Sequence, residues 1–90
     1  MERIRIMLAE DHSMVRQGLK QLIELEHDIK VVAEASNGEE AVNYFFLEQP
    51  DVVLMDINMP KLNGLQALEA IKEKNPDAKI IILTLHQDRE

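Results

Sequence analysis

The stretch DVVLMD, residues 51–56, decides the fold. Four apolar residues follow one another between two acidic ones, without the alternation of apolar and polar residues that a half-exposed strand shows. A short apolar run of this kind is typical of a central strand that is covered on both faces of a parallel sheet. The stretch therefore predicts an α/β protein with helices on both faces of its sheet.

Three other segments favour strands. Residues 3–9 begin with polar and apolar alternation and then become apolar, while residues 78–84 form the most apolar segment of the chain. Residues 29–35 carry Lys30 and Glu34 within a run that otherwise favours β structure, which indicates a strand near a sheet edge.

Helix signals fall between these strands. Ser13 is predicted to cap the first helix, Ser36 and Glu39 to form a capping box for the second, and Asn63 to begin a third that ends near Asn75. The residues predicted to face a core are Val15, Leu19, Leu22 and Ile23 in the first helix, Ala41, Val42, Phe45 and Phe46 in the second, and Leu65, Leu68 and Ile71 in the third. The order β-α-β-α-β-α-β with short connections predicts a parallel sheet with right-handed crossovers.

Composition excludes several classes of protein. The 90 residues allow one domain, and 17 acidic against 10 basic residues give a net charge of −7, which disfavours direct nucleic-acid binding. The absence of cysteine excludes disulfides, thiolate metal sites and thiol nucleophiles. The apolar runs, residues 80–83 among them, reach at most four residues, which is too short to cross a membrane. No signal-peptide core is present, so a cytoplasmic protein is expected.

Four polar residues follow the predicted strands at their carboxyl ends: Glu10 and Asp11 after the first, Asp56 after the third and Thr84 after the fourth. Ligands of open parallel sheets bind at this edge. Three converging carboxylates would repel one another unless a hard cation lay among them, and oxygen ligands suit Mg²⁺. Each acid alone is better explained as a strand terminator or helix cap, and Thr84 alone is explained equally well as an ordinary strand residue. The group of three favours a divalent metal site.

The same residues carry a family resemblance. The pair Glu10-Asp11, residues 56–64 and Thr84 resemble the receiver domain of bacterial two-component response regulators. Residues 11–19 and 83–86 further resemble the NarL/FixJ-like subgroup, whose members usually carry a C-terminal helix-turn-helix (LuxR-type) DNA-binding domain. The resemblance implies a flavodoxin-like, CheY-like sheet with strand order 2-1-3-4. It also implies a signalling module of a transcriptional regulator, not an enzyme.

The resemblance also assigns roles to residues of this chain. It implies that Asp56 accepts a phosphoryl group from a sensor histidine kinase and forms an acyl phosphate. Asp11 and Asp56 would bind Mg²⁺ by their side chains, Asn58 by its backbone carbonyl, and Glu10 directly or through water. Thr84 would contact the phosphoryl oxygen and reorient when it is present. The residues implied to shape the adjoining loop are Met59, Pro60 and Gly64.

Residues 1–90 depart from the family pattern because they hold no fourth helix, no fifth strand ending in Lys-Pro and no fifth helix. Lys61 is a candidate substitute for that lysine, but its loop position favours a solvated surface residue. The sequence is therefore interpreted as a truncated receiver domain that accepts phosphate poorly. Residues 80–83 would lie on an open edge, with one sheet face covered by only one helix. Self-association as a homodimer or domain-swapped oligomer is expected.

Two alternatives differ in class. An Asp-nucleophile phosphohydrolase needs an acid two residues after its nucleophile, and Asn58 at that position cannot act as a general acid. A non-functional or engineered structural fragment that self-associates stays open. His12 and His27 are interpreted as surface groups near helix ends. Met7, Met14 and Met55 are interpreted as core residues.

Overall fold

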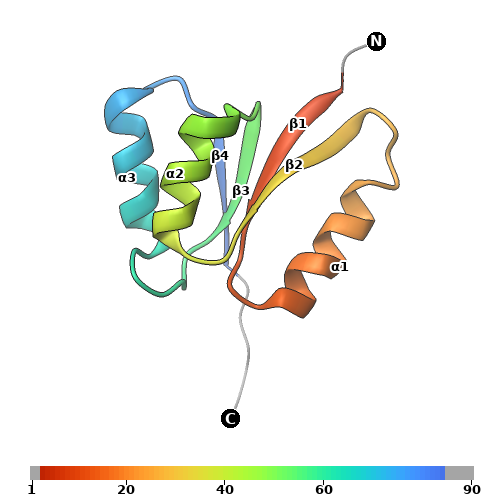
Figure 1. Ribbon diagram of the computed structural model, residues 1–90, viewed down its shortest axis with the longest axis horizontal. Coiled ribbons are helices and arrows are strands. Elements are labelled where there is room, and N and C mark those ends of the chain that lie inside the picture. Colours follow the sequence, from red (N-terminus) through yellow and green to blue (C-terminus); the bar gives the residue numbers. More distant parts are fainter. Residues whose placement is uncertain (1–2, 85–90) are drawn as a thin grey trace.

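The computed structural model describes residues 3–84. Within that range the elements follow the predicted order (Figure 1). The strands are β1 (Ile4–Ala9), β2 (Ile29–Ala35), β3 (Val52–Asp56) and β4 (Ile80–Leu83), and the helices are α1 (Ser13–Ile23), α2 (Gly38–Glu48) and α3 (Gly64–Lys74). No helix in this part of the chain is long and apolar enough to cross a membrane.

The strands form one parallel sheet in the order β2-β1-β3-β4, which confirms the predicted topology. The run at residues 51–56 supplies β3 in an interior position, between β1 and β4. The strand with Lys30 and Glu34 lies at one edge, as expected, and β4 lies at the other. All connections are parallel crossovers, so the carboxyl ends of the strands meet at one edge of the sheet.

The two faces of the sheet are covered unequally. α2 and α3 pack side by side on one face, and α1 lies alone on the other (Figure 1). The core beneath α2 and α3 comprises Met7, Ala9, Ala35, Ala41, Phe45, Val53, Met55, Met59, Ala67, Ile71 and Ala78. The buried cluster beneath α1 is much smaller and comprises Ile6, Leu8 and Val31. Most of the buried apolar surface therefore lies on the face shared by α2 and α3.

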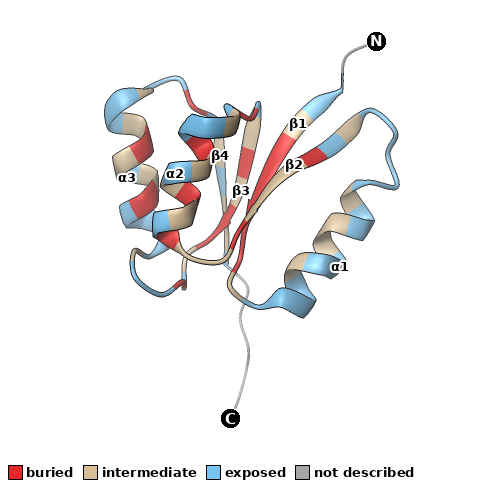
Figure 2. Cartoon of the chain, in the orientation of Figure 1, coloured by how far each residue is buried: buried red, intermediate tan, exposed pale blue. Residues whose placement is uncertain are grey.

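α1 is the least buried helix of the described chain, and none of its residues is fully buried (Figure 2). Leu19 and Ile23 pack against the sheet as predicted. The prediction was wrong for Val15 and Leu22, which are 40% and 65% exposed, and Met14 is not a core residue, because it is 83% exposed. A single helix whose main contacts are with β1 and β2 buries only a narrow stripe of its own surface and leaves both flanks in solvent.

Two further core predictions were wrong in the other helices. Leu65 is 51% exposed and Phe46 is 37% exposed. In α3 the fully buried side chains belong to Ala67 and Ile71, so the buried face is rotated away from Leu65. Small residues such as Ala67 lie where α3 approaches α2 and the sheet, and bulkier ones point outward.

The N-terminus of α2 is capped one residue later than predicted. Asn37 is the N-cap, and its Oδ1 accepts the Glu40 backbone N–H at 2.8 Å. Glu40 Oε1 in turn accepts the Ser36 N–H at 2.8 Å and the Ser36 hydroxyl at 2.9 Å. The predicted pairing of Ser36 with Glu39 is therefore wrong. The hydrogen bonds of Glu40 also place the carboxyl end of β2 directly against α2, and they lower the pKa of the Glu40 carboxyl.

Candidate functional site

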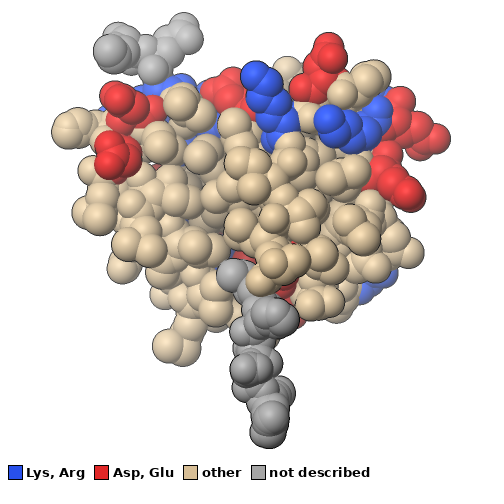
Figure 3. All heavy atoms as spheres, turned by 180° about the vertical axis from the view of Figure 1, so that it is seen from behind, with Lys and Arg blue, Asp and Glu red and all other residues tan. Residues whose placement is uncertain are grey.

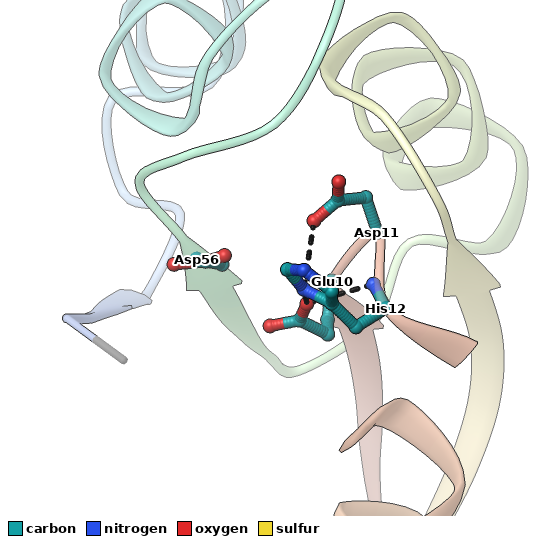
Figure 4. Close-up of side chains that lie close together, drawn as sticks. All are labelled: Glu10, Asp11, His12 and Asp56. Atoms are coloured by element: carbon teal, nitrogen blue, oxygen red, sulfur yellow. Dashed lines mark hydrogen bonds and ion pairs between the residues drawn. The ribbon is translucent and has the colours of Figure 1, made fainter. Parts of the chain in front are cut away.

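The register between β1 and β3 brings Glu10 beside Asp56. Ala9 is paired with Met55, so the next residue of each strand emerges at the same level of the sheet edge. Asp11 follows in the turn that leads into α1. Figure 4 shows the three carboxylates converging there from β1 and β3. The structure thus brings together the three acids that the sequence had placed at this edge.

Burial makes this a demanding place for negative charge. Glu10 is 1% exposed and Asp56 is 2% exposed, and Glu10 Oε1 and Asp56 Oδ1 are buried without a hydrogen-bond partner in the described chain. One ligand atom from each of Glu10, Asp11, His12 and Asp56 lies within 4.8 Å of the others. Buried carboxylate oxygens without donors are costly unless a cation compensates them. Their number and type fit a hard divalent ion such as Mg²⁺.

The pKa of Asp56 is shifted by burial and by the neighbouring charges. Burial raises the pKa of the Asp56 carboxyl, and the neighbouring carboxylates of Glu10 and Asp11 raise it further. The backbone N–H of Asn58 opposes these effects by favouring the ionised form. A bound cation would also favour the ionised, nucleophilic form of Asp56.

His12 was interpreted as a surface group, and the structure gives it a position in the site as well. It is the N-cap of α1, a place predicted for Ser13, which is instead the first residue of the helix. Its backbone N–H and ring Nδ1 lie 2.8 Å and 2.6 Å from Glu10 Oε2, and Nδ1 lies 3.2 Å from Asp11 Oδ1. The hydrogen bond to Glu10 and then the charge of Asp11 raise the pKa of His12. Its adjacency to the acidic pair was the sequence signal for this contact.

Arg16 is a second residue that the sequence did not single out. Its Nη1 donates to the backbone carbonyl of Glu10 at 2.7 Å, and its Nε donates to Glu34 Oε1 at 3.1 Å. Lys20 lies 3.8 Å from the same carboxylate of Glu34. Arg16 therefore links α1 to the carboxyl ends of β1 and β2 and fixes the main chain at Glu10. A positive charge one turn into the helix after the acidic pair is a weak signal for this role.

The loop after β3 carries the other predicted site residues. Asn58 and Pro60 are exposed, whereas Met59 is 8% exposed and belongs to the core beneath α2 and α3. The carbonyl of Pro60 accepts the Gly38 backbone N–H at 3.5 Å. Met59 thus anchors the loop that presents Asn58, while Pro60 connects the loop to the start of α2.

Gly64 lies where this loop turns into α3. A Cβ atom on Gly64 would lie 2.3 Å from the backbone oxygen of Asp56, which is too close for any side chain. The close approach, and not a positive φ, makes glycine necessary at this position. Lys61 is exposed and has a left-handed backbone conformation with φ 70°. Its exposure agrees with the interpretation as a surface lysine.

Thr84 is the last described residue and follows β4. Asp56 is paired with Leu83, and the Ile57 N–H donates to the Leu83 carbonyl at 3.4 Å. Thr84 therefore emerges at the same sheet edge as Asp56, one strand further along, and it is exposed.

Comparison with known proteins agrees with this geometry. The family described as response regulator receiver domain matches residues 6–90. The nitrate/nitrite response regulator protein NarL of Escherichia coli K12 is 42% identical over 89 residues, which is 99% of this chain and 41% of NarL. The chain thus spans about two fifths of the length of curated relatives of this kind.

Solved structures give the same result. A LuxR-family two-component response regulator from Aurantimonas sp. SI85-9A1 is 40% identical with a TM-score of 0.90, over 96% of this chain and 61% of that chain. The response regulator domain of Thermotoga maritima CheB is also 40% identical, with a TM-score of 0.88, over 92% of this chain and 61% of that chain. The similarity therefore covers nearly all of the 90 residues.

Proposed function

The chain belongs to the response regulator receiver domain family, the phosphoacceptor modules of two-component systems, and on that premise we propose that Asp56 is its phosphorylated residue. The observation that carries this proposal is the convergence of Asp56 with Glu10 and Asp11 at the carboxyl edge of the sheet, with buried oxygens that have no hydrogen-bond partner among residues 3–84. Asp56 combines a central strand position with a buried charge that a cation or an electrophile would relieve.

The proposed reaction transfers a phosphoryl group from a kinase histidine. A carboxylate oxygen of Asp56 forms a bond to phosphorus as the bond between phosphorus and the histidine nitrogen breaks, and the released imidazole takes up a proton. The product is an acyl phosphate on Asp56. Receiver domains interact with sensor histidine kinases and are generally non-enzymatic signalling modules, so the chain acts here as acceptor and not as an enzyme.

The acidic group would hold the metal. Asp11 and Asp56 would bind Mg²⁺ by side-chain oxygens, Asn58 by its backbone carbonyl, and Glu10 directly or through water. When bound, Mg²⁺ neutralises negative charge on the phosphoryl oxygens. Gly64 lets the chain pass close to the Asp56 backbone and so keeps this carboxylate at the strand end. Thr84 would donate its hydroxyl to a phosphoryl oxygen, which its place at the same edge supports.

Acetyl phosphate tests the assignment of Asp56. We expect intact mass spectrometry to show a phosphoryl adduct in the presence of Mg²⁺ and none in Asp56→Asn. Asp51→Asn is the matched control, because Asp51 precedes the same strand and is exposed at its other end. Labelling should be slow, because residues 1–90 do not include the lysine that the family resemblance implies beside the acceptor. An adduct that persists in Asp56→Asn would refute the assignment. Decay of the adduct then measures any autophosphatase activity.

We also propose that the 90-residue chain associates with a second copy through β4. This strand is at the sheet edge, and edge strands offer free N–H and C=O groups for pairing. Leu54 is paired with Ile81 on the face that carries α1, and Ile81 is 52% exposed. Figure 3 shows a broad surface with few charged side chains on the side away from the view of Figure 1. Pairing of two β4 strands about a two-fold axis would extend the sheet.

Sedimentation velocity tests the association. The wild-type chain should form dimers as its concentration rises, and Ile81→Lys should stay monomeric because a charge at this position opposes burial. Lys79→Ala is the control, since Lys79 is exposed just before the strand. A folded wild-type monomer at high concentration would refute the proposal.

The domain boundaries and location are proposals as well. We propose that residues 1–90 form the first part of a receiver domain whose fifth strand, fourth and fifth helices and output domain lie outside them. The coverage of only 61% of the CheB response regulator domain chain supports this. We propose a cytoplasmic location, because relatives such as DegU are transcriptional regulatory proteins. The reading frame beyond codon 90 tests the first point directly.

A further inference from the structure

His12 is a close neighbour of the acidic group that the proposed phosphotransfer leaves without a role. Its ring extends from the N-cap of α1 toward Glu10 and Asp11 (Figure 4). Nδ1 lies 2.6 Å from Glu10 Oε2 and 3.2 Å from Asp11 Oδ1. Within the close group of potential ligand atoms, His12 supplies a nitrogen and the other residues supply carboxylate oxygens. The group is therefore chemically mixed, unlike one built from acids alone.

A second observation points to a ligand beside this ring. Glu10 Oε1 and Asp56 Oδ1 have no hydrogen-bond partner in the described chain, although their residues are only 1% and 2% exposed. The ring of His12 engages the other oxygen of Glu10, Oε2. Two buried oxygens in the same group as His12 are thus available to bind a cation.

The types of ligand atom determine which cations bind more tightly when His12 is a ligand. Carboxylate, carbonyl and water oxygens suit Mg²⁺, whereas imidazole suits the later transition metals, whose affinity for mixed sites generally rises from Mn²⁺ to Cu²⁺. Resting on the metal site of the proposed function, we infer that His12 is a metal ligand that makes this site prefer Co²⁺, Ni²⁺ or Zn²⁺ over Mg²⁺. The class of ligand is a divalent transition-metal ion bound by three carboxylates and one imidazole.

The geometry permits this with small movements. Metal–ligand bonds of about 2.1 Å allow ligand atoms to lie about 4.2 Å apart across the metal. The observed limit of 4.8 Å then requires the two most distant ligand atoms to approach each other by at least about 0.6 Å. The His12 side chain is 57% exposed, so it has room to turn. Nδ1 donates to carboxylates in this structure, so ligation requires its proton to leave, or the ring to turn and present Nε2.

The same contact predicts different effects on the two kinds of metal. A transition-metal ion that binds Glu10 replaces the hydrogen bond to His12 with a metal–nitrogen bond. Mg²⁺ would bind Glu10 through Oε1, which does not engage His12, and it would leave the hydrogen bond at Oε2 in place. Removing the imidazole should therefore weaken Co²⁺ binding and leave Mg²⁺ binding unchanged.

Calorimetric titration of the 90-residue chain with CoCl₂ and with MgCl₂ tests the inference. We expect His12→Gln to raise the dissociation constant for Co²⁺ about tenfold or more and not to raise that for Mg²⁺. In the Co²⁺-loaded wild type, NMR should show a paramagnetically shifted imidazole resonance that His12→Gln removes. His27→Gln and His86→Gln are the matched controls, because the sequence contains three histidines.

Several outcomes overturn the inference. If His12→Gln weakened the binding of Co²⁺ and Mg²⁺ equally, His12 would only support the structure of the site. A shifted imidazole resonance that survives in His12→Gln, or disappears in His86→Gln, would place the nitrogen ligand elsewhere. The proposed function is tested separately. Asp11→Asn should weaken the binding of both metals, and phosphoryl labelling of Asp56 should not depend on His12. Loss of Mg²⁺ binding in the wild type would refute that metal site, whatever His12 does.

Discussion

Replacement of Asp56 by Asn should raise the free energy of unfolding when no divalent metal is present. The carboxylate of Asp56 is 2% exposed and lies in a group of ligand atoms no more than 4.8 Å apart. At an effective dielectric constant of about 20, two unit charges about 4.8 Å apart repel by about 3.5 kcal/mol. Relaxation and the nearby His12 reduce this repulsion, so we expect Asp56→Asn to gain about 1–2 kcal/mol.

The pH dependence has a defined sign. Because the pKa of folded Asp56 is raised above its ordinary value of 3.8, protonation of this carboxyl stabilises the folded chain. That stabilisation is fully present below 3.8 and is lost as the pH rises through the folded-state pKa. Asn cannot ionise, so the gain from Asp56→Asn should be largest at neutral pH and should shrink as the pH falls toward 3.8.

Urea denaturation followed by circular dichroism measures this difference in EDTA. For a domain of this size, 1 kcal/mol also corresponds to about 4–8 °C in Tm. Mg²⁺ at ten times its dissociation constant should raise the free energy of unfolding of the wild type by about 1.4 kcal/mol, and that of the variant by less. Asp77→Asn is the control, because Asp77 is exposed in the loop before β4 and should show no such gain. A variant that is less stable than the wild type in EDTA at neutral pH would refute this reasoning.

Three further substitutions test the surroundings of the site by denaturation. Arg16→Gln should lower the free energy of unfolding by about 2 kcal/mol, because the guanidinium makes two hydrogen bonds. Lys20→Gln is the control and should lower it by under about 0.5 kcal/mol. An equal loss in the two variants would contradict the special position of Arg16. Glu40→Gln should lower the free energy of unfolding by about 1 kcal/mol at pH 7. Because the pKa of folded Glu40 lies below its ordinary value of 4.5, this difference should persist above pH 4.5 and disappear as the pH falls through the folded-state pKa. A difference that is independent of pH would contradict this. Gly38→Ala should cost about 3 kcal/mol because its Cβ would lie 1.9 Å from a backbone oxygen, while Gly18→Ala has open space and should gain about 0.5–1 kcal/mol. Similar effects of the two alanines would be contrary to expectation.

The sequence predicted the strands and the acidic edge because both follow from chain order. Once β1 and β3 are parallel neighbours, the residues at their carboxyl ends, Glu10 and Asp56, come together at one edge of the sheet. Helix faces were harder to predict. Val15 and Leu65 fit an apolar stripe, but their burial depends on how many neighbours cover the helix, which periodicity does not encode.

The side chains that reach between elements were the least predictable. Arg16 reaches from α1 to the main chain of Glu10. The N-cap of α2 lies one residue later than predicted because Asn37 accepts the Glu40 N–H, and Glu40 accepts the Ser36 N–H that a capping box would have paired with Glu39. Such choices depend on loop geometry at the scale of one hydrogen bond. The sequence contains the competing donors and acceptors but does not rank them.

The shallow packing of α1 has a consequence for motion. A helix without a fully buried residue should open locally at a lower free energy than α2 or α3, so its amides should exchange with D₂O first. The same helix carries Arg16, which fixes the main chain at Glu10. Each opening of α1 therefore breaks the hydrogen bond between Arg16 and the Glu10 main chain, beside the acidic group. A cation bound there should slow amide exchange throughout α1, which would make the fraying of this helix a direct report of site occupancy.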